Sequence, residues 1–264
     1  MAAYHGGKQR IAKLIASTIK ANSNDRIENY CEPFCGMLSV FKEVATTNTL
    51  KRVELGDINE SVIKMWDAAQ DGWIPTTNIT EEQFLKLKTS VPSALKGFVG
   101  HQFAFGGYYF KSYAPKHSKN KNFGKAAQLR IVKTGELLKK CDAEISHGSY
   151  MQFSRLTGFV IYCDPPYANT GDSGYYVDKP DGSRIKVKWD EEEDARFWKW
   201  CKMMAKRNFV FVSGYEEPKD VDVETIVEKN THHSGTAAGR SGKSKKRIEK
   251  LFKVAAASPH REAT

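Results

Sequence analysis

The chain has 264 residues, of which 40% are hydrophobic and 11% aromatic, so it is long enough to bury a core of ordinary size. Its 41 basic residues against 31 acidic ones give a net charge of +10, which favours a polyanionic partner because neutralised phosphates release counterions. No apolar run is long enough to cross a bilayer, and the first residues lack the apolar stretch of a signal peptide. We therefore expect an intracellular, cytoplasmic protein rather than a secreted or membrane-bound one.

The five cysteines form a scattered set of odd number. Only Cys31 and Cys35 are close in sequence, and no second cysteine pair or spaced histidine pair completes a zinc site. We predict reduced thiols and no metal.

The first elements predicted along the chain are a helix and a strand. Apolar residues recur at helical spacing in residues 8–21, which indicates a helix. Residues 27–31 are typical of a short strand, which runs into the turn at residues 32–36. A helix should follow this turn.

A second strand and helix come next. Residues 52–55 predict a strand that stops at residues 56–59, and residues 60–69 have a helical pattern. This order of strand, turn, helix, strand and acid predicts an α/β fold with a doubly wound, Rossmann-like sheet. Such sheets bind their ligands outside the carboxyl ends of the strands.

The pattern changes between residues 75 and 150. Residues 80–83 resemble a capping box that opens a helix. Seven aromatic residues then lie between Phe98 and Tyr113, and seven basic residues without an acid lie between Lys111 and Lys133. This mixture suits nucleic acid, and the alternative is that most of the aromatics form the core of the segment. We expect an inserted, mostly helical module.

The α/β pattern resumes after this segment. Residues 159–163 form an apolar run that predicts a buried strand, and it ends at Asp164-Pro165-Pro166-Tyr167. A polar loop should extend to about residue 189. Residues 190–206 predict an amphipathic helix, acidic at its start and basic at its end as the helix dipole prefers, and residues 208–212 predict another buried strand.

The tetrapeptide at residues 164–167 has the elements of a site for an amino group. Two prolines donate no backbone hydrogen bonds and each fixes its φ angle, so they hold the backbone rigid at the end of a strand. The Asp164 carboxylate and the Pro165 carbonyl would offer two acceptors, and Tyr167 an aromatic face for stacking. Two acceptors on an aromatic amine favour a pyramidal nitrogen whose lone pair can attack an electrophile, which is positioning plus electrostatic stabilisation.

These residues carry a resemblance to a known family. Asp164-Pro165-Pro166-Tyr167 after an apolar strand is similar to motif IV of the amino-methyltransferases that modify DNA. Residues 4–8, Tyr-His-Gly-Gly-Lys, resemble the N-terminal element of the Dam-type DNA adenine methyltransferases. Residues 32–36 with 39–41 resemble their motif I, and residues 56–59 their motif II. Four motifs in the family's order span nearly the whole chain, although many members have glycine where this chain has Leu38.

The resemblance implies an S-adenosylmethionine-dependent methyltransferase that acts on the exocyclic amine of an adenine in double-stranded DNA, after the base is flipped out of the duplex. The catalytic residues that it implies are Asp164, Pro165, Pro166 and Tyr167. The implied cofactor-binding residues are Tyr4, Lys8, Pro33, Phe34, Cys35, Gly36, Asp57, Ile58 and Asp164. Residues 1–74 and 151–264 would form the catalytic domain, and residues 75–150 the inserted target-recognition domain.

The expected DNA-binding residues come from the two basic segments and from a loose match to the family's target-recognition segment. They are Lys111, Lys121, Asn122, Lys125, Arg130, Arg240, Lys243, Lys245 and Lys246. The alternative is that these segments are solvated loops rich in lysine.

Other functions remain as alternatives. Residues 237–244 fit a permissive P-loop pattern, but no buried strand precedes them and residues 245–252 favour a basic strand instead of the required helix. A non-enzymatic DNA-binding protein is the runner-up. Among methyltransferases, action on cytosine amines or on RNA is a further alternative, since cytosine-modifying relatives more often carry serine in place of Asp164.

Overall fold

The computed structural model describes residues 7–114, 123–166, 175–232 and 246–256. Its main sheet has seven strands in the order β3-β2-β1-β4-β7-β9-β8. The strands are β1 (Asn29–Glu32), β2 (Arg52–Asp57), β3 (Glu144–His147), β4 (Val160–Cys163), β7 (Phe209–Gly214), β8 (Val223–His232) and β9 (Lys246–Val254). Strands β3, β2, β1, β4 and β7 run parallel, and β9 is antiparallel to both of its neighbours. This confirms the predicted doubly wound α/β sheet.

The helices lie where the sequence predicts them or, for α5 and α6, inside the segment expected to be mostly helical. They are α1 (Ala12–Ala21), α2 (Ser39–Thr47), α3 (Glu60–Gln70), α4 (Glu81–Lys88), α5 (Ala94–Gln102), α6 (Phe123–Lys140) and α7 (Glu191–Ala205). Thr80 and Gln83 form the expected capping box of α4, and Asn59 caps α3 by accepting from the backbone N–H groups of Ser61 and Val62. These side chains satisfy donors that a helix start leaves without an intrahelical partner.

The two faces of the sheet are covered by different helices. Tyr30, Leu55 and Tyr162 belong to a core shared with α1, α2 and α3. The neighbouring strand residues Cys31 and Ile161 belong to the core beneath α7, where Phe197, Trp200, Cys201 and Met204 are buried. Successive side chains of a strand point to opposite faces, so this alternation places the sheet between two helical layers.

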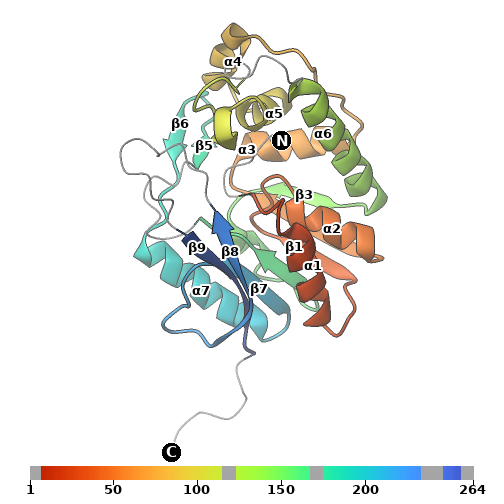
Figure 1. Cartoon of the computed structure of the whole chain (residues 1–264), viewed down its shortest axis with the longest axis vertical. Coiled ribbons are helices and arrows are strands. Elements are labelled where there is room, and N and C mark those ends of the chain that lie inside the picture. The colour runs from red at the N-terminus through yellow and green to blue at the C-terminus, as the bar shows by residue number, and fades with distance from the viewer. Residues whose placement is uncertain (1–6, 115–122, 167–174, 233–245, 257–264) are drawn as a thin grey trace, which may run out of the picture.

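Helices α4, α5 and α6 gather at one end of the molecule, above α3 (Figure 1). Two glycines allow close packing there. A Cβ atom on Gly97 of α5 would lie 2.1 Å from the Ser61 carbonyl oxygen, and one on Gly135 of α6 would lie 2.2 Å from the Ala69 carbonyl oxygen. Helices α5 and α6 therefore pack directly on α3, a helix of the α/β domain.

The position of strand β3 shows where the helical part of the expected insertion ends. It lies inside the range 75–150 assigned to the target-recognition module, yet it pairs with β2 at the edge of the main sheet. Residues 144–147 are thus part of the α/β sheet, and the helical part of the segment runs from α4 to α6. Its role in target recognition remains a prediction.

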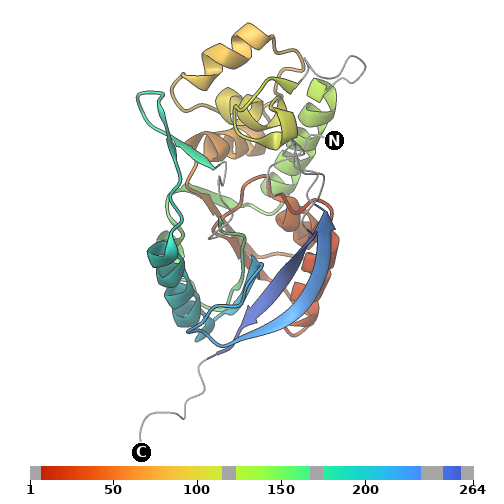
Figure 2. The same cartoon turned by 60° about the vertical axis from the view of Figure 1, so that its left-hand side comes forward.

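Besides β3, three strands were not predicted. The range given to a polar loop contains a hairpin of β5 (Tyr176–Asp178) and β6 (Arg184–Lys186), which reaches from the sheet towards the helical end (Figure 2). Its strands are three residues long and mostly half-exposed or exposed, so they show no apolar periodicity. Strand β8 was also missed, whereas its partner β9 confirms the basic strand expected at residues 245–252.

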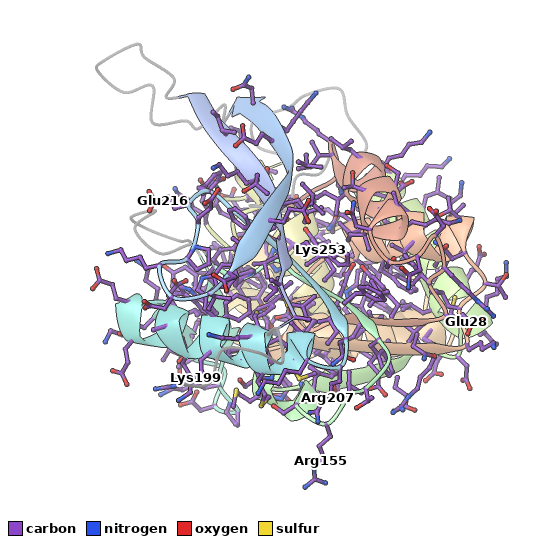
Figure 3. All side chains as sticks on the ribbon, turned by 90° about the horizontal axis from the view of Figure 1, so that it is seen from below. Glu28, Arg155, Lys199, Arg207, Glu216 and Lys253 are labelled. Atoms are coloured by element: carbon purple, nitrogen blue, oxygen red, sulfur yellow. The ribbon has the colours of Figure 1, made fainter. Side chains whose placement is uncertain are left out.

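The opposite end of the molecule is polar. Glu28, Arg155 and Arg207 come directly before strands or in the turns that lead to them, and Figure 3 shows Arg155 extending away from the body of the protein. No helix among the described residues is long and apolar enough to span a membrane.

Candidate active site

A cavity of about 520 Å³ opens at the carboxyl ends of the parallel strands. Strand β1 lies between β2 and β4, which is the point where strand order reverses and where ligands of open α/β sheets bind. The cavity lining includes the turns that follow four strands: Pro33 to Gly36 after β1, Asp57 to Asn59 after β2, Gly148 to Met151 after β3, and Asp164 with Pro166 after β4. The structure thus brings together the segments identified as motifs I, II and IV.

The turn after β1 has an unusual backbone. Gly36 has φ 44° and Leu38 has φ 53°, in the left-handed region that disfavours side chains. The Gly36 carbonyl accepts a hydrogen bond from the Trp66 indole at 2.8 Å. The position of Leu38 explains the glycine found in many relatives, since the backbone takes a left-handed conformation there. Leu38 is nevertheless fully buried.

Asp57 is held rigidly at the end of β2. One carboxylate oxygen accepts from the backbone N–H of Gly36 at 2.9 Å, and the other from that of Asn59 at 2.8 Å. Burial raises the pKa of Asp57, and these backbone donors limit the rise. The next residue, Ile58, is exposed and lines the cavity. This arrangement suits a ligand that has hydroxyl groups to donate to the Asp57 carboxylate and a flat ring to lie against Ile58.

Glu32 is a buried acid at the end of β1 that motif comparison named only as part of a turn. Its carboxylate accepts from the Tyr30 hydroxyl at 2.6 Å. Burial raises the pKa of Glu32 to about 8, against the opposing effect of that hydrogen bond. At neutral pH Glu32 is therefore largely protonated and contributes little charge to the cavity.

Lys8 and Asp164 form the charged centre of the site. The Lys8 ammonium lies 2.8 Å from Oδ1 of Asp164 and 3.0 Å from Oε1 of Glu249. Lys8 and Glu249 are buried, whereas Asp164 is partly exposed to the cavity. Burial alone would lower the pKa of Lys8, but Asp164, Glu249 and Tyr162 together outweigh it and raise this pKa well above its usual value. Lys8 is consequently a fixed positive charge.

An aromatic cluster forms the wall near the turn after β1. The ring of Phe34 stacks on Tyr150 with centroids 5.6 Å apart and meets Trp189 edge-on at 5.9 Å. Phe34, Tyr150 and Trp189 all line the cavity. Their apolar faces suit a planar ligand group. The aromatic cluster was not found from sequence because its members come from three separate elements.

The hairpin β5–β6 forms another wall and is anchored to the helical end. Asp178 of β5 and Lys96 of α5 are completely buried, with Nζ and Oδ1 3.0 Å apart. The other oxygen of Asp178 accepts from the hydroxyls of Ser61 and Tyr109, each at 2.5 Å. Tyr109 also lines the cavity, so this anchor joins the hairpin, the helical end and the site.

Of the remaining predicted residues, some line the cavity, some lie elsewhere, and others are outside the described part of the chain. Tyr4, Tyr167, Lys121, Asn122, Arg240, Lys243 and Lys245 lie outside the described residues, as does the side chain of Lys246. Lys111 and Lys125 are exposed. Arg130 is half-buried and donates to Gln102 of α5 at 2.9 Å, so part of its role is to join α5 and α6. Pro33, Phe34, Cys35 and Pro166 line the cavity, and Pro165 precedes Pro166 without lining it.

The described cysteines are all free thiols. Among the described residues no group of three or more histidine, cysteine, aspartate or glutamate side chains could hold a metal ion.

Comparison with known proteins addresses the family. Residues 4–100 match the family model of the D12 class N6 adenine-specific DNA methyltransferases. The match covers a little over a third of the chain, and this part is similar to a D12 class methyltransferase domain. This match confirms the expected relationship to the Dam-type enzymes and supports an adenine-specific DNA methyltransferase as the enzyme class. The matched segment includes the N-terminal element and the turns after β1 and β2, and it ends before Asp164.

Comparisons with curated proteins and with solved structures say less about the family. A search of curated proteins returned no match. Among solved structures, the chain is similar to a structure described as "Putative methyltransferase yhhF from Escherichia coli", with 11% sequence identity and a TM-score of 0.40. The alignment covers 94% of this chain and 85% of that one. At this TM-score we base no argument on the similarity, and the assignment of the fold rests on the strand order itself.

Besides Trp189 of the aromatic cluster, sequence reasoning missed three residues of the site. Glu249 is the only acid between Arg240 and Lys253. A single acid in a basic segment was the one feature of the sequence that could have indicated its role. Tyr150 follows β3, whose place in the sheet was not predicted. Glu32 occupies the last position of β1, where the burial of an acid cannot be read from the residues alone.

Proposed function

We propose that this protein transfers a methyl group from S-adenosylmethionine to the N6 amine of an adenine flipped out of double-stranded DNA. The observation that supports this most is the single cavity that joins Asp164 to the turn after β1 and to Asp57. Its volume of about 520 Å³ falls in the range of small-molecule sites. The D12 class match makes adenine in DNA the leading substrate.

The cavity fits the proposed cofactor. Asp57 is oriented to accept hydrogen bonds from ribose hydroxyls, and Ile58 with the aromatic cluster offers apolar faces to a purine ring. The left-handed Gly36 permits close approach of the backbone. The residues that would hold the cofactor are Tyr4, Lys8, Pro33, Phe34, Cys35, Gly36, Asp57, Ile58 and Asp164.

The charges near Asp164 also fit a cationic ligand. Lys8 supplies one positive charge, while Asp164 and Glu249 supply two negative ones. The cluster therefore has an excess of one negative charge in a cavity that limits solvent screening. When bound, the cofactor supplies an electrophilic methyl group on a positively charged sulfur, which complements this excess.

Asp164 would act on the amine of the target base. Its carboxylate and the Pro165 carbonyl would accept the two hydrogens of the amine, turn the nitrogen lone pair towards the methyl group and stabilise the positive charge that develops on nitrogen. This requires fixed acceptors more than a strong base. Lys8 holds Oδ1 of Asp164 in place, and Tyr167 would stack on the flipped base.

The DNA would contact the helical end and the basic segments. A base inside a duplex cannot reach the cavity, so flipping is required. Exposed Lys111 and Lys125 lie on the helical side, and we propose that they contact phosphates together with Lys121, Asn122, Arg130, Arg240, Lys243, Lys245 and Lys246. On this proposal residues 75–150 include the target-recognition segment, with β3 belonging to the catalytic sheet.

The Asp164→Ala variant tests the proposal. We expect methyl transfer from tritiated S-adenosylmethionine to genomic DNA to fall by about 10²-fold or more, because a preorganised acceptor is lost, while the affinity for DNA largely remains. Asp71→Ala, an exposed aspartate at the end of α3, is the matched control and should keep normal turnover.

Two outcomes of these experiments would contradict the proposed function. Normal turnover of Asp164→Ala would overturn the mechanism. Absence of transfer by the unaltered protein, with DNA binding intact, would favour a non-enzymatic DNA-binding protein. Sequencing the labelled DNA for methyladenine, with RNA as a parallel substrate, separates adenine in DNA from cytosine amines and from RNA.

A further inference from the structure

The ammonium of Lys8 lies between two carboxylates that come from different parts of the chain. Asp164 follows β4, and Glu249 is on β9, yet their oxygens lie 2.8 and 3.0 Å from the same nitrogen. Glu249 is not among the residues that line the cavity. It therefore contacts Lys8 from the side that faces the protein interior.

Glu249 occupies an inward position on a rigid strand. Strand β9 pairs with β7 on one side and β8 on the other, and Glu249 lies opposite Lys229 in the register with β8. Leu251, two residues along and thus on the same face, is buried in the core. An acid at such a position is costly to bury unless it is paired, and Lys8 is the cation that compensates it.

Lys8, unlike Glu249, does not lie on a strand of the sheet. It precedes α1, and its carbonyl accepts a hydrogen bond from the Ile11 N–H at 2.9 Å. Its long side chain is held at the ammonium end by charge. Besides the two carboxylates, Tyr162 of β4 contributes to the electrostatic environment of Lys8, and the Tyr162 hydroxyl is paired with that of Ser213 at 2.8 Å.

We infer that Glu249 is a positioning residue that divides the charge of Lys8 between itself and Asp164, and so keeps Asp164 an effective acceptor. This inference rests on the proposed role of Asp164. With one carboxylate alone, the ammonium would pair fully with Asp164 and neutralise it. With two, Lys8 orients Oδ1 of Asp164 while the cluster keeps its excess negative charge.

Replacing Glu249 with glutamine removes the charge and leaves the shape almost unchanged. Of the two carboxylates on Lys8, only that of Asp164 would then remain charged, so the acceptor that grips the amine weakens. We expect kcat to fall by about tenfold, which corresponds to a loss of about 1.4 kcal/mol in transition-state stabilisation, with the KM for DNA unchanged within about twofold. Glu249→Asp restores the charge and should recover part of kcat.

A double-mutant cycle separates positioning from a general structural role. Lys8→Met alone should lower kcat strongly. Adding Glu249→Gln to Lys8→Met should cause no further loss, because Glu249 acts through the lysine. Glu228→Gln on neighbouring β8 is the control: Glu228 is exposed and pairs with Lys250, so its kcat should equal that of the unaltered protein.

Several outcomes would overturn the inference. Normal kcat in a folded Glu249→Gln variant, or an equal loss from Glu249→Gln with and without Lys8, contradicts it. If Glu249→Gln does not fold, Glu249→Asp provides the same test through its own kcat and its coupling to Lys8→Met. An inactive Asp164→Ala with a normal Glu249→Gln refutes this inference alone, whereas an active Asp164→Ala refutes the proposed function and the inference with it.

Discussion

Two buried lysines of this protein have opposite surroundings. Lys96 and its partner Asp178 are completely buried at the helical end, where Ser61 and Tyr109 add hydrogen bonds to the carboxylate. Lys8 contacts one buried acid and one acid that faces a cavity. The first arrangement matches one cation to one anion, and the second leaves an excess negative charge.

The difference shows that a buried lysine–carboxylate pair can either hold two segments together or orient a carboxylate in a binding cavity. A closed pair with satisfied partners fixes one segment against another, and losing a partner leaves an uncompensated charge in the interior. A shared lysine beside a cavity leaves charge available to a ligand. We therefore expect changes near Lys96 to reduce stability most, and changes near Lys8 to reduce the rate most.

The largest effect on stability should come from Lys96→Met. This change leaves Asp178 buried without its cation, so we expect the free energy of unfolding to fall by about 3–5 kcal/mol, measured by urea denaturation. Lys51→Met is the control, since the Lys51 side chain is 65% exposed in its pair with Glu28 and this pair should contribute less than about 1 kcal/mol. Equal small losses in the two variants would show that the buried pair does not anchor the hairpin.

A smaller effect is expected for Leu38→Gly, in the turn on the cavity side. Glycine relieves the left-handed backbone, worth about 1–2 kcal/mol, but deleting a fully buried leucine side chain costs more, about 2–5 kcal/mol. The net loss should be roughly 0–4 kcal/mol in thermal or urea unfolding. A variant more stable than the unaltered protein would mean that backbone strain outweighs packing at this turn.

A further effect depends on pH and concerns Glu32. Its pKa is about 8 in the folded protein against an ordinary 4.5, so between these values the folded state holds a proton that the unfolded state has lost. The contribution of Glu32 to stability is complete below pH 4.5 and declines as pH rises towards 8. Glu32→Gln lacks this decline. Between pH 5 and pH 8 this decline amounts to about 3–4 kcal/mol in the unaltered protein, so the Tm of Glu32→Gln should fall less over this range, by roughly 10 °C.

Parallel Tm curves for the two proteins would show that Glu32 ionises normally. Glu136→Gln, an exposed acid on α6, should follow the unaltered protein and serves as the control for this comparison.

The sequence predicted the parts of the fold that depend on local patterns. The helices α3 and α7 and the strands β2, β4 and β7 have clear periodicity or apolar runs, and the turns that follow β1, β2 and β4 contain recognisable motifs. Because parallel strands end at one edge of a sheet, Asp57 and Asp164 were placed near each other without knowledge of the register.

The rest depended on contacts between distant segments. The hairpin β5–β6 is short and polar, and its anchor needs Lys96 from a segment about eighty residues earlier. Glu249 and Tyr150 reach the site region only because β9 and β3 join the sheet. The family resemblance implied a cofactor-binding role for Lys8, but it did not reveal that two acids share its ammonium.

The anchored hairpin has a consequence for how ligands enter and leave. Swinging the hairpin away from the helical end would separate Lys96 from Asp178 in the interior, which makes it a slow route for exchange. The cavity residues Ile58, Met151 and Ile185 are instead 46, 46 and 48% exposed. A ligand that leaves the cavity past these exposed apolar side chains would not require Lys96 to separate from Asp178.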